Sequence, residues 1–201
     1  MAWKEDGAGR TALLVDGARR VGKSYVVEQF AKAAYKSYIL IDFNRVSDEV
    51  KDLFNHYLND LDMLFMYLAG YYNVKLYEHE SLIIFDEVQL FPRARAAIKY
   101  LVADGRYDYI ETGSLMSIKR NVKDIVIPSE ERHIKMYPMD FEEFLWAMGN
   151  DVLMDIIRKH YNLRKPLGQG HAPQGHGLLP AIPHCRRNAA GCGRVYSEPR
   201  L

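Results

Sequence analysis

Eight consecutive residues constrain the fold of this chain more than any other part of its sequence. Residues Gly17–Ser24 (GARRVGKS) fit the pattern G-x-x-x-x-G-K-[ST]. The apolar run Thr11–Asp16 comes directly before them and the helical pattern Lys23–Ala34 directly follows, as a strand–loop–helix unit requires. In such a unit the glycines let the backbone wrap a phosphate chain, and the amides at the helix N-terminus attract it. The alternative interpretation is a glycine turn with a solvated lysine.

The pattern assigns a role to each end of this loop. Lys23 is expected to reach the β- and γ-phosphates, and the Ser24 hydroxyl is expected to bind Mg²⁺. The predicted cofactors are therefore ATP and Mg²⁺. The residues predicted to surround the nucleotide are Gly17, Ala18, Arg19, Arg20, Val21, Gly22, Lys23, Ser24 and Tyr25.

Short apolar strand patterns alternate with helical patterns along most of the chain. This alternation predicts an α/β fold with a five-stranded parallel sheet and helices on both faces. Strands are predicted at Thr11–Asp16, Ser37–Phe43, Ser81–Asp86, Tyr107–Thr112 and Arg132–Tyr137. Helices are predicted at Lys23–Ala34, Ser47–His56, Asp60–Tyr72, Arg93–Ala103, Asp140–Met148 and Asp151–Tyr161.

Two carboxylates end the predicted strand at Ser81–Asp86. Asp86 is expected to hold the hydration shell of Mg²⁺, and Glu87 is expected to orient and deprotonate an attacking water. Ligands of open α/β sheets bind at the carboxyl ends of the strands, where this pair lies. Acidic pairs at strand ends also serve as helix caps or solvated turns, so the pair is informative chiefly beside the glycine-rich loop.

Four motifs in this order and spacing carry a family resemblance: GARRVGKS, LIIFDEVQLFP, ETGSL and YPMDFEEFLWAMG. They resemble prokaryotic AAA+ ATPases, P-loop NTPases whose core precedes a C-terminal domain of unknown function. The resemblance covers residues 8–165 and implies that Gly17–Ser24 is the Walker A loop. It also implies that Asp86 and Glu87 form Walker B, and that the segment Pro138–Leu145 closes the core.

The resemblance further implies a sensor for the γ-phosphate. In the additional-strand glutamate class, the strand that ends at Thr112 would lie between the loop strand and the acidic strand. Ser114, or else Thr112, is then the sensor and the third catalytic residue beside Lys23 and Glu87. The alternative is that Ser114 caps a short helix beginning at Leu115. An arginine finger is expected as well, with Arg120 and then Arg132 as candidates.

The sequence divides into three predicted parts: an ATPase core at 1–149, a helical start of a C-terminal part at 150–164, and a tail at 165–201. The tail holds five of the eight prolines and six of the fourteen glycines, so we expect it to be unstructured. Family members usually continue far beyond the equivalent of Leu163. One hypothesis is that a frameshift produced this tail, which the nucleotide sequence would test.

Composition excludes several classes of protein. The formal net charge is +1 and 48% of the residues are hydrophobic, which excludes a disordered chain and a strongly basic nucleic-acid binder. The longest apolar stretch, Met63–Tyr72, is half of the roughly 20 residues that span a bilayer. We therefore expect a cytoplasmic protein without a membrane partner.

Three functions remain open at this stage. The first is an ATPase that acts on an unknown protein or nucleic-acid partner, possibly as a homo-oligomer. The second is a small-molecule P-loop kinase, which Glu87 beside Asp86 disfavours because the pair suits water as the acceptor. The third is a nucleotide-dependent interaction module with little turnover.

Overall fold

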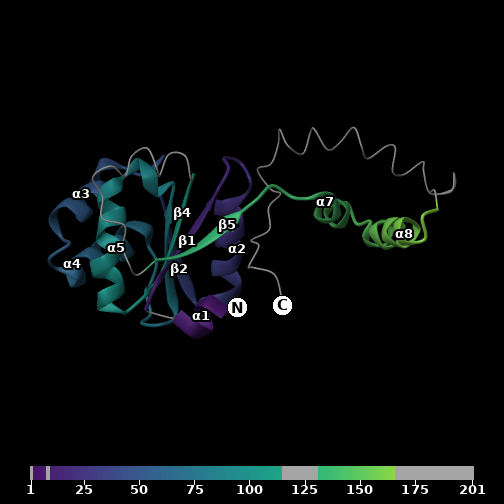
Figure 1. The fold of residues 1–201 in the computed structure, drawn as a ribbon. Helices are drawn as coiled ribbons and strands as arrows, with labels where there is room; N and C mark the ends of the chain where they lie inside the picture. Colours follow the sequence, from purple (N-terminus) through teal and green to yellow (C-terminus); the bar gives the residue numbers. More distant parts are fainter. Residues whose placement is uncertain (1, 8–9, 115–130, 166–201) are drawn as a thin grey trace.

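Five parallel strands form a single sheet at the centre of the fold (Figure 1). The structure is a computed structural model and describes residues 2–7, 10–114 and 131–165. Residues 166–201 of the predicted tail, Arg120 and the alternative short helix from Leu115 lie outside these ranges. The strands are β1 (Ala12–Gly17), β2 (Ser37–Asp42), β3 (Ser81–Asp86), β4 (Asp108–Ser114) and β5 (Glu131–Met136).

The strand order is β2-β3-β4-β1-β5, and every neighbouring pair is parallel. β4 therefore lies between β1 and β3, as the family resemblance implies. All carboxyl ends meet at one edge of a parallel sheet. The glycine-rich loop after β1, the acidic pair after β3 and the end of β4 thus reach the same edge.

Helices cover both faces of the sheet (Figure 1). On one side lie α1 (Ala2–Gly7) and α2 (Lys23–Ala34), and on the other lie α3 (Asp48–His56), α4 (Leu61–Tyr72) and α5 (Pro92–Asp104). α7 (Phe141–Ala147) and α8 (Asp151–Asn162) follow β5 and contact each other. Among the helices within the described ranges, none has the length and apolar character to cross a membrane.

The two faces of the sheet bury separate apolar clusters. On the α3–α5 side, Phe43, Phe54 and Phe85 pack edge-on or tilted against one another. On the α2 side, residues of β1 and β3 pack against Val27 and Ala31. β3 and β4 are buried along their whole length, which explains why β3 reads as a short apolar run in the sequence. β4 differs, because it buries polar residues such as Glu111 and Thr112.

All predicted strands and helices form, and each bound lies within two residues of its prediction. Two elements were not predicted: α1 and the short 3-10 helix η1 (Val88–Leu90). α1 depends on a tertiary contact, because Trp3 is buried against the α2 side and its Nε1 donates to Thr11 O at 3.2 Å. Sequence periodicity carries no signal for such a contact.

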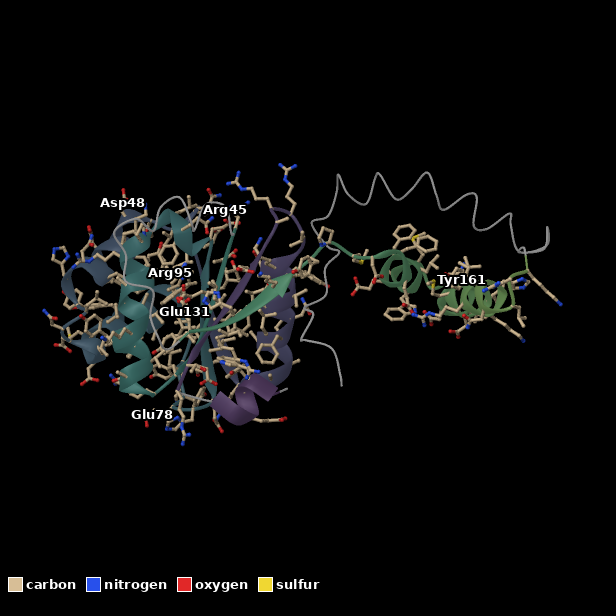
Figure 2. The ribbon with its side chains drawn as sticks, viewed as in Figure 1. Arg45, Asp48, Glu78, Arg95, Glu131 and Tyr161 are labelled. Carbon is tan, nitrogen blue, oxygen red and sulfur yellow. The ribbon has the colours of Figure 1, made fainter. Side chains whose placement is uncertain are left out.

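A buried ion pair ties α5 to the edge strand β5. Arg95 Nη2 donates to Glu131 Oε2 at 3.0 Å and to Oε1 at 3.2 Å, and the two side chains are 3% and 1% exposed. Figure 2 shows the two side chains meeting between α5 and β5. Burial raises the pKa of Glu111, in β4 beside this pair, well above its ordinary value, and the charge of Glu131 raises it further. The direction of this shift favours the protonated, neutral form of Glu111 in the folded protein.

Glu111→Gln should remove the cost of protonating this carboxyl on folding. In the unfolded chain Glu111 titrates near 4.5, so above that pH the wild type takes up a proton when it folds. The wild type then loses stability relative to the variant by about 1.4 kcal/mol per pH unit, until the pH reaches the pKa of the folded state. Urea unfolding of both proteins from pH 4.5 to 8 measures this difference, and a difference that does not change with pH would contradict the assignment.

Candidate functional site

The glycine-rich loop turns the chain from the end of β1 into the start of α2. Gly17 is the last residue of β1 and Lys23 is the first residue of α2. Arg20 and Gly22 have the left-handed backbone angles φ 63° and φ 92° that make this sharp turn possible. The first-turn amides of α2 therefore face the loop, where the positive end of the helix dipole attracts anions.

Gly17 lies too close to β5 to carry a side chain. A Cβ at this position would lie 2.2 Å from the carbonyl oxygen of Met136, a backbone atom that cannot move aside alone. The two residues are register partners at the carboxyl ends of their strands. The first glycine of the motif is thus required by the packing of β1 against β5, in addition to the flexibility of the loop.

Lys23 folds back over the loop. Its Nζ donates to Ala18 O at 2.9 Å and approaches Gly17 O at 3.4 Å, and the residue is 5% exposed. Burial lowers the pKa of Lys23, whereas the charges of Glu87, Asp86 and Asp16 raise it. The ammonium therefore lies at the centre of the loop, partly desolvated and facing carboxylates, where it attracts any anion that enters.

One carboxylate oxygen joins residues from three elements. Ser24 Oγ of α2 donates to Asp86 Oδ1 at 2.8 Å, and Thr112 Oγ1 of β4 donates to the same oxygen. Burial raises the pKa of Asp86, and the two hydroxyl hydrogen bonds oppose that rise. Hydroxyl and carboxylate oxygens are the hard ligands that Mg²⁺ prefers, so Ser24 and Asp86 suit this ion.

Glu87 follows Asp86 in a left-handed conformation at φ 53°. Its backbone N–H donates to Thr112 Oγ1 at 3.3 Å, and its Oε2 accepts a hydrogen bond from Gln89 Nε2. Left-handed backbone is costly for a residue with a side chain and persists where the surroundings hold it. β4 and η1 thus hold this turn on both sides, and the charge of Glu87 acts on Lys23.

The two sensor candidates lie at different places along β4. Thr112 contacts Asp86 directly, whereas Ser114 is the last residue of β4, buried and in register with Gly17. Ser114 therefore lies beside the loop, and Thr112 lies beside the acidic pair. Of the arginine-finger candidates, Arg132 lies in β5 and is the register partner of Leu13 in β1. It comes four residues before Met136, the carboxyl end of β5, which places it about 13 Å from that end at strand spacing.

The remaining loop residues differ in exposure. Val21 is buried in the α2-side cluster, and Tyr25 is 53% exposed in the first turn of α2. Ala18, Arg19 and Arg20 are exposed. The buried residues thus anchor the loop, and the exposed ones form its outer surface.

Sequence reasoning missed two polar residues at this site. Asp16, 2% exposed, precedes the loop and acts on the charge of Lys23. Gln89, 4% exposed, binds Glu87 from η1. Neither residue belongs to the loop pattern, and only their burial beside charged groups reveals them.

The donor set of the site fits a cation that prefers oxygen ligands. Within the described ranges, no three or more His, Cys, Asp or Glu side chains gather as a metal site. The oxygens of Ser24 and Asp86 beside an anion-attracting loop instead suit a cation that is shared with a phosphate. This arrangement is the one that nucleotide-binding loops use.

Comparison with known protein families agrees with this geometry. A family model described as an AAA domain matches residues 9–145 of the 201. The chain belongs to the AAA domain family. Membership makes it a nucleotide-binding protein of the ATPase type, and the matched range contains all five strands and the whole of the site. A search among curated proteins finds no match.

Gly17→Ala should separate the loop of the AAA domain from β5. The added methyl group must push aside the Met136 carbonyl, so we expect a loss of about 1–3 kcal/mol in unfolding free energy. ATP affinity should fall at least tenfold because the loop shifts with the strand. Gly70→Ala in α4 is the matched control, since nothing lies within 4 Å of its new Cβ and alanine favours helix by about 0.5–1 kcal/mol. Thermal unfolding and nucleotide titration measure both, and equal behaviour of the two variants would contradict the packing argument.

Proposed function

We propose that this AAA domain protein binds Mg–ATP at Gly17–Ser24 and hydrolyses it, with Glu87 as the base that activates water. The observation that carries the proposal is the shared oxygen of Asp86, which brings the loop, the acidic pair and β4 together. A glycine turn that binds no ligand would not require the loop, the acidic pair and β4 to meet at one oxygen.

The loop holds the phosphates through its backbone and Lys23. Two loop carbonyls accept hydrogen bonds from Lys23 Nζ, so the ammonium stays inside the loop, ready to pair with a phosphate oxygen. Ala18 and Arg19 are exposed, so the outer side of the loop faces solvent, from which the nucleotide would enter. Tyr25 would then lie at the rim, where we propose that it contacts the nucleotide.

Ser24 and Asp86 would hold the metal ion. Their oxygens lie 2.8 Å apart across the loop and β3. Bound Mg²⁺ would neutralise charge that develops on the phosphates. Thr112 keeps the Asp86 carboxylate oriented through its hydroxyl, and Ser114 is the residue of β4 that lies nearest the loop by register.

Glu87 is proposed to accept a proton from the attacking water. Its charge raises the pKa of Lys23, so its carboxylate lies within electrostatic reach of the loop that would hold the phosphates. The left-handed turn at φ 53° is the local strain that this orientation requires. With this acid beside Asp86, water is a better acceptor than a second substrate, which favours hydrolysis over the kinase alternative.

Hydrolysis is proposed to move the C-terminal helices and thereby act on a protein or nucleic-acid partner. β5 touches the loop at Met136, and α7 begins five residues later at Phe141. Asp140 caps α7 by accepting from Glu143 N at 2.8 Å, while Glu143 binds the Asp140 amide, so the start of this helix is rigid. We propose that a shift of the loop at Gly17 passes through β5 to α7 and α8, which contact each other.

Glu87→Gln should retain ATP binding and lose hydrolysis. The amide has the shape of the acid but cannot accept a proton, so we expect phosphate release to fall about 10²- to 10⁴-fold while ATP affinity changes less than threefold. Lys23→Ala is the companion variant and should lose nucleotide binding itself. Phosphate release and fluorescent-ATP titration measure both effects.

Three results would redirect the proposal. Unchanged turnover in Glu87→Gln would remove Glu87 from the reaction. Turnover only after addition of a hydroxyl acceptor would favour the kinase. ATP binding by the wild type without phosphate release would favour the third function, a nucleotide-dependent interaction module with little turnover.

A further inference from the structure

Gln89 is a buried polar residue that the proposed reaction does not use. It lies in η1, directly after the acidic pair, and is 4% exposed. Amides are rarely buried this deeply unless their hydrogen bonds serve the surrounding structure. Its Nε2 donates to Glu87 Oε2, so the side chain of the proposed base has a dedicated partner.

Glu87 is held from two sides. Thr112 fixes the backbone by accepting from Glu87 N at 3.3 Å, and Gln89 fixes one oxygen of the carboxylate. A glutamate has three rotatable side-chain bonds, so backbone restraint alone leaves the carboxylate free to swing. The contact of Oε2 with Gln89 removes that freedom.

The restraint of Glu87 by Gln89 matters because Lys23 also attracts the Glu87 carboxylate. Glu87 exerts the largest of the carboxylate charge effects on Lys23, so the ammonium attracts the Glu87 carboxylate. Without a second partner, the base would be drawn onto Lys23 and would compete with the phosphates for it. The Gln89 amide, as a second partner of the carboxylate, opposes this collapse without adding a charge.

We infer that Gln89 is a positioning residue for the base, an inference that rests on the proposed function. Gln89 binds Oε2 of Glu87 so that Oε1 accepts the proton of the attacking water. In that step the water oxygen bonds to the γ-phosphorus, the bond from this phosphorus to the β–γ bridging oxygen breaks, and ADP leaves. Gln89 keeps its own protons throughout and acts only through Glu87.

Gln89→Met tests the inference. Methionine has nearly the same shape but no donor, so kcat for ATP hydrolysis should fall about 10- to 100-fold while KM stays within about twofold. Gln89→Glu should lower kcat at least as far, because an ionised carboxylate cannot donate and repels Glu87. The matched control is Gln29→Met on α2, an exposed glutamine for which we expect unchanged kinetics.

The Glu87→Gln background separates positioning from a structural role. If Gln89 acts through the Glu87 carboxylate, Gln89→Met should leave the residual rate of Glu87→Gln within about twofold. An equal fall of kcat in both backgrounds, or an unchanged or increased kcat in the wild-type background, would overturn the inference. Failure of the proposed function is distinct, because it would show as full activity of Glu87→Gln itself.

Discussion

The site depends on a single carboxylate oxygen that two hydroxyl groups from separate elements share. Asp86 Oδ1 accepts from Ser24 of α2 and from Thr112 of β4, so the glycine-rich loop, β3 and β4 meet at one atom. This contact requires β4 to lie between β1 and β3. With β1 beside β3 instead, Thr112 would lie elsewhere and Glu87 would lose the partner of its backbone amide.

The other side of the glycine-rich loop is constrained by its packing against β5. The first glycine of the motif lies against the backbone of Met136, so β5 and the loop cannot move independently. β5 is also tied to α5 by the buried pair of Arg95 and Glu131. Removing one partner of such a pair leaves an unpaired buried charge, which costs about 3–5 kcal/mol. The edge strand is therefore held both by the loop and by α5.

The sequence predicted the elements and the edge of the sheet where the site lies. The alternation of apolar runs with helical patterns located the strands and helices, because a buried strand such as β3 reads as a short apolar run and α2 begins directly at Lys23. The motif spacing also predicted the site residues Lys23, Ser24, Asp86 and Glu87. The structure brings them to that edge, and their roles are proposals.

What the sequence did not predict are contacts between distant segments. The burial of Trp3, the raised pKa of Glu111 beside Glu131 and the amide of Gln89 on Glu87 each depend on which side chains the fold brings together. The same holds for the choice between Thr112 and Ser114, two residues apart on one strand. Only the register of β4 distinguishes them, because it places Thr112 against Asp86 and Ser114 beside Gly17.

The most direct measurement of the central claim is the gain in ATP affinity that Mg²⁺ provides. Calorimetric titration of the wild type should show ATP binding at least tenfold tighter with Mg²⁺, about 1.4 kcal/mol. Asp86→Asn should lose this gain and keep its affinity for ATP without Mg²⁺, whereas Asp42→Asn, at the register-matched end of β2, should retain it. An equal Mg²⁺ gain in Asp86→Asn and the wild type would contradict the account.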